Sequence, residues 1–493
     1  MPVHELAQQP TLLMQLALLI PLLGAALILL CHRWPNLRET VTLFTAGSLL
    51  ACVLGLLPSL LGGGRPAVVL LEFLPGLPLM LALEPLGMLF AIIASGLWIV
   101  NSLYSIGYMR GNNEQHQTGF YICFAVALSA TMGIALAGNL LTLFLFYEAL
   151  TLSTYPLVTH KRNETALAGG RRYLGYLLAS SLIFLMAAIV LTYVIGGSIE
   201  FTPKGILAGK LDSNTGALLL ALYVFGIGKA GLMPIHKWLP AAMVAPTPVS
   251  ALLHAVAVVK AGVFCVIKVI IYVFGLETLR GADWAGWLVY VASFTVITAS
   301  VIALYQDNLK RRLAYSTISQ LGYVVLAASV LAPLSMLGAV LHIAAHAVSK
   351  ITLFFAAGAI YTASHKTEVS QLNGIGRAMP WTMGAFAIGS LSMIGLPPTV
   401  GFTSKWYMLA GALDAGQLFV VGVLMVSTLL NAGYYLPILY RAFLCKADAP
   451  TTHGEAPWPS VLALCITAAL TIALFCYPQP VVKLAQMLLA GAS

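Results

Sequence analysis

Apolar runs of about twenty residues recur from one end of the chain to the other, and they constrain the fold more than any other feature. Each run is long enough to cross a hydrocarbon core of roughly 30 Å as a helix. Only 8% of the 493 residues are charged, whereas a soluble globular protein carries roughly 25%. The sequence therefore predicts an all-α integral membrane protein with about fourteen transmembrane helices.

The polar breaks between apolar runs define the expected spans. They are residues 11–31, 41–62, 80–104, 118–137, 139–158, 172–196, 215–236, 246–273, 285–305, 312–331, 333–362, 381–413, 417–440 and 459–476. No connection is long enough to hold a second domain, so residues 1–493 are expected to form a single polytopic membrane domain. The first run lacks the positive flank of a signal peptide and is longer than a signal peptide's apolar region, so we interpret it as a spanning helix.

The positions of the Lys and Arg residues predict the orientation of the chain. With fourteen helices, fifteen of the 25 fall on one side, five on the other and five inside apolar runs. Cytoplasmic loops carry the excess of positive charge. Both termini are therefore expected outside the cytoplasm, in a plasma or inner membrane. This segregation also accounts for the net charge of +9 without any binding of nucleic acid.

Signatures of cofactors and metals are lacking in the sequence. The seven cysteines lie mostly in apolar runs and no two have CxxC spacing, which argues against zinc and iron–sulfur sites. The sequence around Gly228-Lys229 does not satisfy the P-loop pattern, and neither GxGxxG after a strand nor HExxH occurs. We expect no cofactor, no metal and no redox centre in this chain, and hence a transport subunit rather than an enzyme.

Proline interrupts two of the apolar runs, at Pro234 and at Pro397-Pro398, and a Lys-Trp pair follows each interruption. These are the seventh and twelfth expected helices. Interrupted helices at corresponding positions predict repeated transporter halves with a site near the bilayer midplane. The carbonyl groups freed by such breaks need side chains or water as partners, so the breaks are expected to line cavities.

A few ionisable residues lie inside the apolar runs, where a central charge costs at least about 2.5–3.5 kcal/mol. They are Glu148, Lys229, His254, Lys260, Lys268, His342, His346, Lys350 and Lys405. Glu148 is interpreted as the only acid deep in a run, so these groups do not form the balanced pairs of a structural network. Desolvated lysines can release protons near neutral pH, and histidine titrates there already. The set predicts a path for protons or small cations.

Helical spacing and bland alternatives refine this prediction. His342, His346 and Lys350 are four residues apart and share one helix face over a rise of about 12 Å. A lone buried histidine is more often a packing residue, and Glu148 is alternatively a structural ion-pair partner. Lys268 lies near the end of its run and is expected to snorkel to the surface.

Several motifs resemble a known family. They are Phe146-Tyr147-Glu148-Ala149-Leu150, Met233-Pro234-Ile235-His236-Lys237-Trp238, Asp307-Asn308-Leu309-Lys310-Arg311-Arg312-Leu313-Ala314-Tyr315-Ser316-Thr317-Ile318-Ser319-Gln320 and Gly401-Phe402-Thr403-Ser404-Lys405. Over roughly residues 80–440 the chain resembles the antiporter-like subunits of respiratory complex I, Mrp-type cation/proton antiporters and membrane-bound hydrogenases. The surroundings of Lys260 resemble the Mrp D-type and hydrogenase-type subunits most.

This resemblance implies fourteen helices, with helices 4–8 (residues 118–273) and 9–13 (residues 285–440) as inverted repeats. It implies that Glu148 and Lys229 form an ion pair at the start of a proton path and that Lys405 stands at its exit. It places along the central hydrated axis His254, Lys260, His346 and Lys350. His342 is an additional candidate on that axis.

The leading hypothesis is a proton or monovalent cation/proton translocating subunit of a multi-subunit membrane complex, most like the D-type subunit of the Mrp antiporter. Its partners would be other membrane subunits, and its ions protons or also Na⁺. A second hypothesis is an antiporter-like pumping subunit of a complex I-like or hydrogenase complex, whose redox centre belongs to partner chains. A stand-alone proton-coupled solute carrier and a scaffold subunit that no longer conducts are further alternatives.

Overall fold

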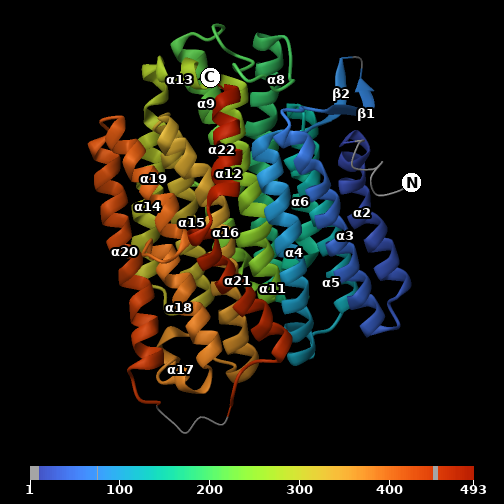
Figure 1. The fold of residues 1–493 in the computed structure, drawn as a ribbon, viewed down its shortest axis with the longest axis vertical. Coiled ribbons are helices and arrows are strands. Elements are labelled where there is room, and N and C mark those ends of the chain that lie inside the picture. The colour runs from blue at the N-terminus through green and yellow to red at the C-terminus, as the bar shows by residue number, and fades with distance from the viewer. Residues whose placement is uncertain (1–9, 75, 448–452, 493) are drawn as a thin grey trace.

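The computed structural model describes residues 10–74, 76–447 and 453–492. It is a bundle of long helices with a two-stranded hairpin at one end (Figure 1). The first elements are α2 (Pro10–Leu30), α3 (Pro35–Leu61), β1 (Ala67–Leu74), β2 (Leu77–Ala82), α4 (Pro85–Gly111), α5 (Gln117–Ala135), α6 (Leu140–Val158), α7 (Glu164–Ala179), η1 (Ser180–Leu185), α8 (Met186–Gly196), α9 (Ser213–Gly226), η2 (Gly228–Ala230), α10 (Trp238–Ala241), η3 (Ala242–Val244), α11 (Thr247–Ala251), η4 (Leu252–Val256), α12 (Val258–Lys268) and η5 (Val269–Phe274). The others are α13 (Leu276–Arg280), η6 (Asp283–Ala285), α14 (Trp287–Leu304), α15 (Leu309–Ser329), α16 (Pro333–Ser364), η7 (Val369–Gln371), α17 (Ile375–Ala378), α18 (Pro380–Ile394), α19 (Val400–Asp414), α20 (Leu418–Phe443), α21 (Trp458–Cys476) and α22 (Gln479–Ala492).

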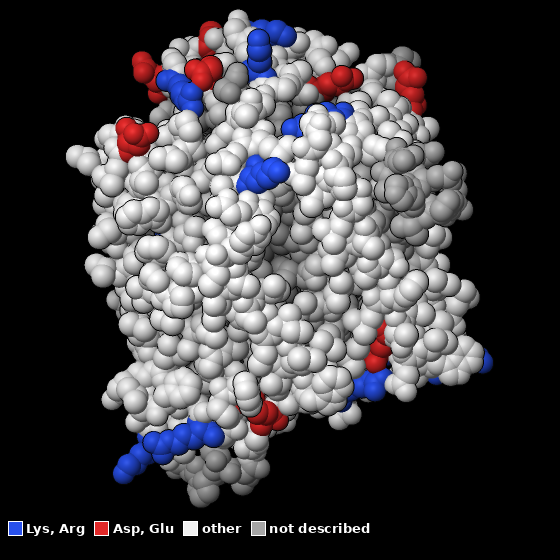
Figure 2. Space-filling model, in the orientation of Figure 1, with Lys and Arg blue, Asp and Glu red and all other residues white. Residues whose placement is uncertain are grey.

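Eleven helical stretches of the described chain are long and apolar enough to cross a membrane. Figure 2 shows charged residues gathered at the two ends of the visible face, with a mostly uncharged band between them. The other three expected spans coincide with α9 and the break after it, with α15, and with α18 and α19, which do not meet the same measure of length and hydropathy. The predicted helical membrane fold is confirmed, and the total of fourteen spans stays a prediction.

Two elements were absent from the sequence-based expectation. Residues 67–82 form an antiparallel hairpin, β1–β2, whose turn contains Gly76 at a φ of +77°. This apolar stretch is too short to cross a bilayer as a helix, and its alternative is to pair with itself. The second element is α22, a C-terminal helix that packs against α4 and α16.

Both predicted helix breaks are present. The helix α9 ends at Gly226, and a short 3₁₀ segment, η2, carries Lys229 before the chain becomes helical again at α10. The helix α18 ends at Ile394, and Gly395 follows with a φ of +95°, a left-handed conformation that glycine adopts without strain. A new helix, α19, then begins at Val400 and carries Lys405.

Two helical stretches form the centre of the bundle. The apolar windows of Thr247–Phe274 and Pro333–Ser364 are wholly buried inside the protein, whereas those of the other nine candidate spans are 33% to 72% buried. The second stretch, α16, packs against α15, α18, α19 and α21. Six of the nine ionisable residues singled out in the sequence lie on these two central stretches, so the fold itself places them in the interior.

Candidate functional site

Lys229 lies at the first helix break, with its ammonium group turned toward α6. Its Nζ donates to the carbonyl oxygen of Tyr147 at 2.8 Å and to Oγ1 of Thr151 at 2.6 Å. The same atom lies 3.1 Å from the centroid of the Tyr147 ring, within the range of a cation–π interaction. One turn of α6 therefore supplies a polar seat for this lysine.

Glu148 follows Tyr147 on α6, yet it does not bind Lys229 in this structure. Both carboxylate oxygens are buried and find no hydrogen-bond partner among the described residues. No ion pair within 4.0 Å joins Glu148 to Lys229 either, although both side chains are described. The ion pair implied by the resemblance is thus open here, because the ammonium group is bound to Tyr147 and Thr151 instead.

His254 sits on the π-helical segment η4 and is completely buried. Its ring lies 4.8 Å from that of Phe354, and neither ring nitrogen has a hydrogen-bond partner among the described residues. Short π segments inside α-helices are frequent at functional sites. The geometry thus leaves both nitrogens of His254 free for a proton or for water.

Lys260 on α12 and His346 on α16 meet at the contact between the two central stretches. Nζ of Lys260 and Nδ1 of His346 share a short hydrogen bond, while Nε2 of His346 has no partner among the described residues. Two bases at such a distance repel strongly when both are charged. The pair therefore favours a single shared positive charge, which is suited to passing one proton at a time.

His342 lies one turn before His346 on the same face of α16, with the two ring centroids 6.1 Å apart. Its Nε2 lies 2.9 Å from Oε1 of Gln320 on α15, and its Nδ1 lies 2.9 Å from Oγ of Ser404 on α19. Both ring nitrogens are therefore hydrogen-bonded, and His342 joins three helices.

Lys350 lies one turn after His346 and points toward α15 and α20. Its Nζ donates to Oγ of Ser316 at 2.9 Å and to the hydroxyl of Tyr435 at 3.0 Å. No carboxylate lies within 4.0 Å of this buried ammonium group among the described residues. Hydroxyl groups, which both donate and accept, are its partners.

Lys405 reaches back from α19 to the end of α18 at the second break. Its Nζ donates to the carbonyl oxygens of Met393 and Ile394, at 2.7 and 3.1 Å. These are terminal carbonyls of α18, where the helix dipole favours a positive charge. The ammonium group also lies 4.6 Å from the ring centroid of Tyr323.

Two chains of hydrogen bonds connect α16 to Lys405 through the Met393 carbonyl. In the first, Gln320 bonds His342 and donates Nε2 to the carbonyl oxygen of Met393 at 3.4 Å. In the second, which starts at Lys350 and Ser316, Tyr434 donates to Ser316 and to Asn431, and Asn431 donates to Met393 at 3.3 Å. The structure thus brings His342 and Lys350 into contact with the exit-side lysine.

The linking residues Ser316, Gln320, Asn431 and Tyr434 received no role from the sequence. Ser316 and Gln320 lie four apart on α15, and Asn431 and Tyr434 lie three apart on α20. Polar residues at helical spacing inside a spanning helix are the signal that would have found both pairs.

Lys268 corrects one expectation, because it does not reach the surface. It is 1% exposed, and its Nζ lies 2.6 Å from Oε1 of Glu84 and donates to the carbonyl oxygen of Ala137 at 2.6 Å. The rings of Phe201 and Phe264 lie 4.3 and 5.4 Å from the ammonium group. Lys268 therefore belongs to a sealed ion pair at the hairpin end of the bundle.

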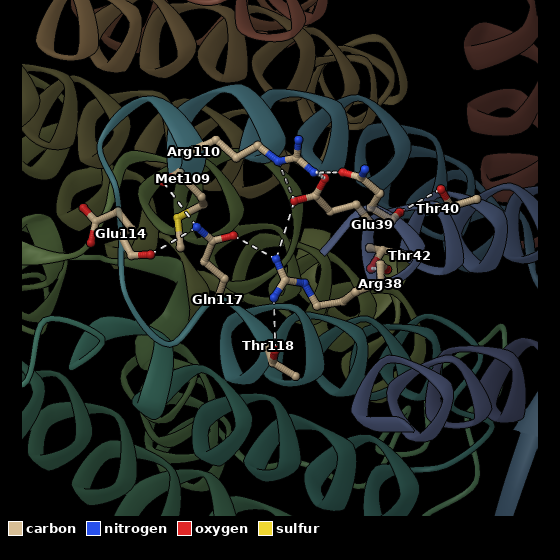
Figure 3. A network of polar contacts seen from close by, with 10 residues as sticks. Arg38, Glu39, Thr40, Thr42, Met109, Arg110, Glu114, Gln117 and Thr118 are labelled. Carbon is tan, nitrogen blue, oxygen red and sulfur yellow. Dashed lines mark hydrogen bonds and ion pairs between the residues drawn. The ribbon is translucent and has the colours of Figure 1, made fainter. Parts of the chain in front are cut away.

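Glu148 is also not the only buried acid. Glu84 is 9% exposed at the start of α4, and Glu39 is 4% exposed in the first turns of α3. Glu39 binds Arg110 at 2.5 Å, beside Arg38, which donates to Gln117 (Figure 3). Sequence reasoning missed Glu39 because it placed the start of this helix after the acid, at residue 41.

Breaking the Glu84–Lys268 pair is expected to destabilise the protein strongly. Removing one partner of a buried ion pair costs about 3–5 kcal/mol, because it leaves the other charge without compensation. Glu84→Gln and Lys268→Met should each lower the midpoint of thermal unfolding in detergent. The double variant should recover part of the loss, and single variants that unfold like the parent protein would contradict a stabilising pair.

Long apolar helices around a buried row of lysines and histidines define a polytopic membrane protein with an internal ionisable path. A family model described as "NADH:quinone oxidoreductase/Mrp antiporter, TM" matches residues 137–431. The chain belongs to this family of antiporter-like membrane subunits, as its motifs predicted.

Individual relatives agree with this assignment. The "NADH-quinone oxidoreductase subunit N" of Desulforudis audaxviator is 33% identical over 434 residues, which cover 84% of each chain. A probable K⁺/H⁺ antiporter protein of the A/B type from Rhizobium meliloti is 31% identical over 466 residues, which cover 90% of this chain and 45% of that protein. A chain of the solved Mrp complex from Dietzia sp. has a TM-score of 0.86 and 22% identity over 98% of both chains, a likeness of fold alone.

Proposed function

We propose that this chain translocates protons, or exchanges a monovalent cation for protons, within a multi-subunit membrane complex most like the Mrp antiporter. The observation that carries this proposal is the row of buried bases that ends in the two hydrogen-bonded chains to Lys405. Histidines, lysines, hydroxyls and amides are groups through which protons pass, and charged groups inside a membrane mark ion pathways.

The path begins at Glu148 and Lys229, runs through His254 to Lys260 and His346, and ends at Lys405. Lys229 is seated on Tyr147 and Thr151 in this structure, so the pair with Glu148 is open. In this state Lys229 lacks the stabilisation of a bound carboxylate and can give its proton to the central bases. Closing the pair would reload Lys229.

Repeated halves and the orientation of the chain form part of this proposal. Residues 118–273 and 285–440 would be inverted repeats, each with one broken helix and one lysine at its break. The end of the bundle rich in Lys and Arg would face the cytoplasm, with both termini outside. The redox or catalytic centre, if the complex has one, would belong to partner chains.

A second candidate is the pumping subunit of a complex I-like enzyme, because one relative at 33% identity is an "NADH-quinone oxidoreductase subunit N". The same buried path would serve this function, driven by redox chemistry in other chains. Identification of the chains that co-purify in mild detergent separates the two. Small membrane proteins alone support the antiporter, and iron–sulfur or flavin proteins support the pump.

Substitution of Lys350 tests the proposed path. Lys350→Met keeps the length of the side chain but removes the ammonium group that binds Ser316 and Tyr435. Proton flux in vesicles containing the assembled complex should fall by roughly tenfold or more, as expected when a group of a relay is removed. His346→Ala should behave alike, and Lys204→Met, on an exposed loop, is the control. Normal flux in both axis variants would place the path elsewhere.

A further inference from the structure

A cavity of about 180 Å³ lies where α16 ends and α15 begins, on the side that the charge distribution predicts to be cytoplasmic. Three lysines line it: Lys161 from the turn after α6, Lys310 from α15 and Lys366 from the segment after α16. Asn308 and Tyr361 contribute further polar groups. A water molecule takes about 30 Å³ in the liquid, so the space admits a few waters or one small polyatomic ion.

The charges around this cavity are all of one sign. The lining contains no Asp or Glu, and none of the three lysines lies within 4.0 Å of a carboxylate in the part of the chain that the structure describes. The acid nearest in sequence to Lys366, Glu368, accepts hydrogen bonds from Asn308 and Thr367 instead. Like charges facing one small space repel, and their repulsion is relieved by an anion between them.

Neutral groups hold two of these lysines at the cavity. Nζ of Lys310 donates to the carbonyl oxygen of Ala245 at 2.6 Å, and Nζ of Lys161 lies 5.9 Å from the ring centroid of Tyr361. Each ammonium group has three protons, so the single hydrogen bond of Lys310 leaves donors for a ligand. The cavity is therefore rich in donors and positive charge.

We propose that this cavity is a binding site for a phosphate-type oxyanion. Ammonium groups bind phosphate oxygens through charge-assisted hydrogen bonds, and basic pockets between membrane helices on the cytoplasmic side suit anionic headgroups as well. The oxyanion comes either from the cytoplasmic solution or from an anionic lipid. The site is separate from the path of buried bases, and its occupancy does not depend on the direction or kind of ion transport.

Ala245 gives this site a connection to the interior. It directly precedes Pro246 and α11, which continues into the segment that carries His254. An oxyanion that drew the Lys310 ammonium group away from the Ala245 carbonyl would loosen the start of this segment. Binding at the surface would in this way alter the surroundings of a buried histidine.

Thermal unfolding of the full chain in nanodiscs tests the site. In neutral phosphatidylcholine discs, inorganic phosphate should raise the unfolding midpoint of the parent protein, as any ligand of the native state does. Lys310→Gln should weaken the apparent phosphate affinity by roughly tenfold or more. Lys161→Gln tests the same claim at an exposed position where folding is not at risk. Lys446→Gln, an exposed lysine outside the cavity, should respond to phosphate like the parent.

The source of the oxyanion is decided by a second set of discs that contain phosphatidylglycerol. A phosphate effect in neutral discs that is lost in the Lys310 and Lys161 variants identifies a soluble oxyanion. Stabilisation by phosphatidylglycerol alone, again lost in those variants, identifies a lipid headgroup. The proposal is overturned if neither anion stabilises the parent, or if the cavity variants and Lys446→Gln respond equally.

Discussion

Glu148→Gln is expected to stop ion transport although the volume of the side chain hardly changes. Glu148 is a buried carboxylate with no hydrogen-bond partner among the described residues, and it stands beside the residue that seats Lys229. Its charge has no structural bond to maintain here, so its value lies in closing onto the lysine. Without that charge Lys229 cannot be reloaded, and flux should fall by roughly tenfold or more.

Graded variants separate this role from a merely structural one. Glu148→Asp keeps the charge about one methylene further back and should retain part of the flux, and Lys229→Ala should resemble Glu148→Gln. The double variant should be no worse than either single one, because residues that act as a unit are not additive. Proton or sodium flux in vesicles is measured at equal levels of assembled complex. Full flux in Glu148→Gln would mean that the path begins elsewhere.

Gly262→Ala is expected to damage both folding and transport, through a different cause. Gly262 lies on α12, two residues after Lys260, and its Cα faces the backbone of η2. An added Cβ would overlap the backbone of Lys229 and Ala230, which cannot rotate away as a side chain can. Overpacking a tight core costs about 1–3 kcal/mol, and occasionally more, and here it displaces the lysine that starts the path.

A matched glycine makes this result interpretable. Gly96 lies on the membrane helix α4, and a Cβ built there meets nothing within 4 Å. Gly96→Ala should leave both the thermal midpoint and the flux unchanged, while Gly262→Ala lowers both. Equal behaviour of the two variants would show that α12 and η2 do not depend on their close approach.

The helical membrane fold could be predicted from the sequence because hydrocarbon imposes a minimum length on each span. The two breaks were predictable at Pro234 and Pro397, where proline removes backbone donors. The burial of His346 and Lys350 followed from their position in a long apolar run. The hairpin at residues 67–82 was not predictable in this way, because a short apolar run fits a strand as well as part of a helix.

Pairings across the bundle were harder to foresee. That Lys268 would find Glu84, some 180 residues earlier in the chain, depends on how the helix ends meet, and no local pattern carries that information. The same holds for Gln320 and Asn431, which meet at one carbonyl group from two different helices. Glu148 shows the converse case, since its expected partner Lys229 is bound elsewhere in this structure.

The carbonyl oxygen of Met393 receives three donors, from Lys405 at 2.7 Å, Asn431 at 3.3 Å and Gln320 at 3.4 Å. A carbonyl oxygen has two lone pairs, so the three donors compete and cannot all bind at full strength. When Lys405 is charged it outcompetes the two amides, and when it is neutral they can tighten. The helix end at Met393 thus acts as a junction at which the protonation of one lysine sets the tension on two branches at once.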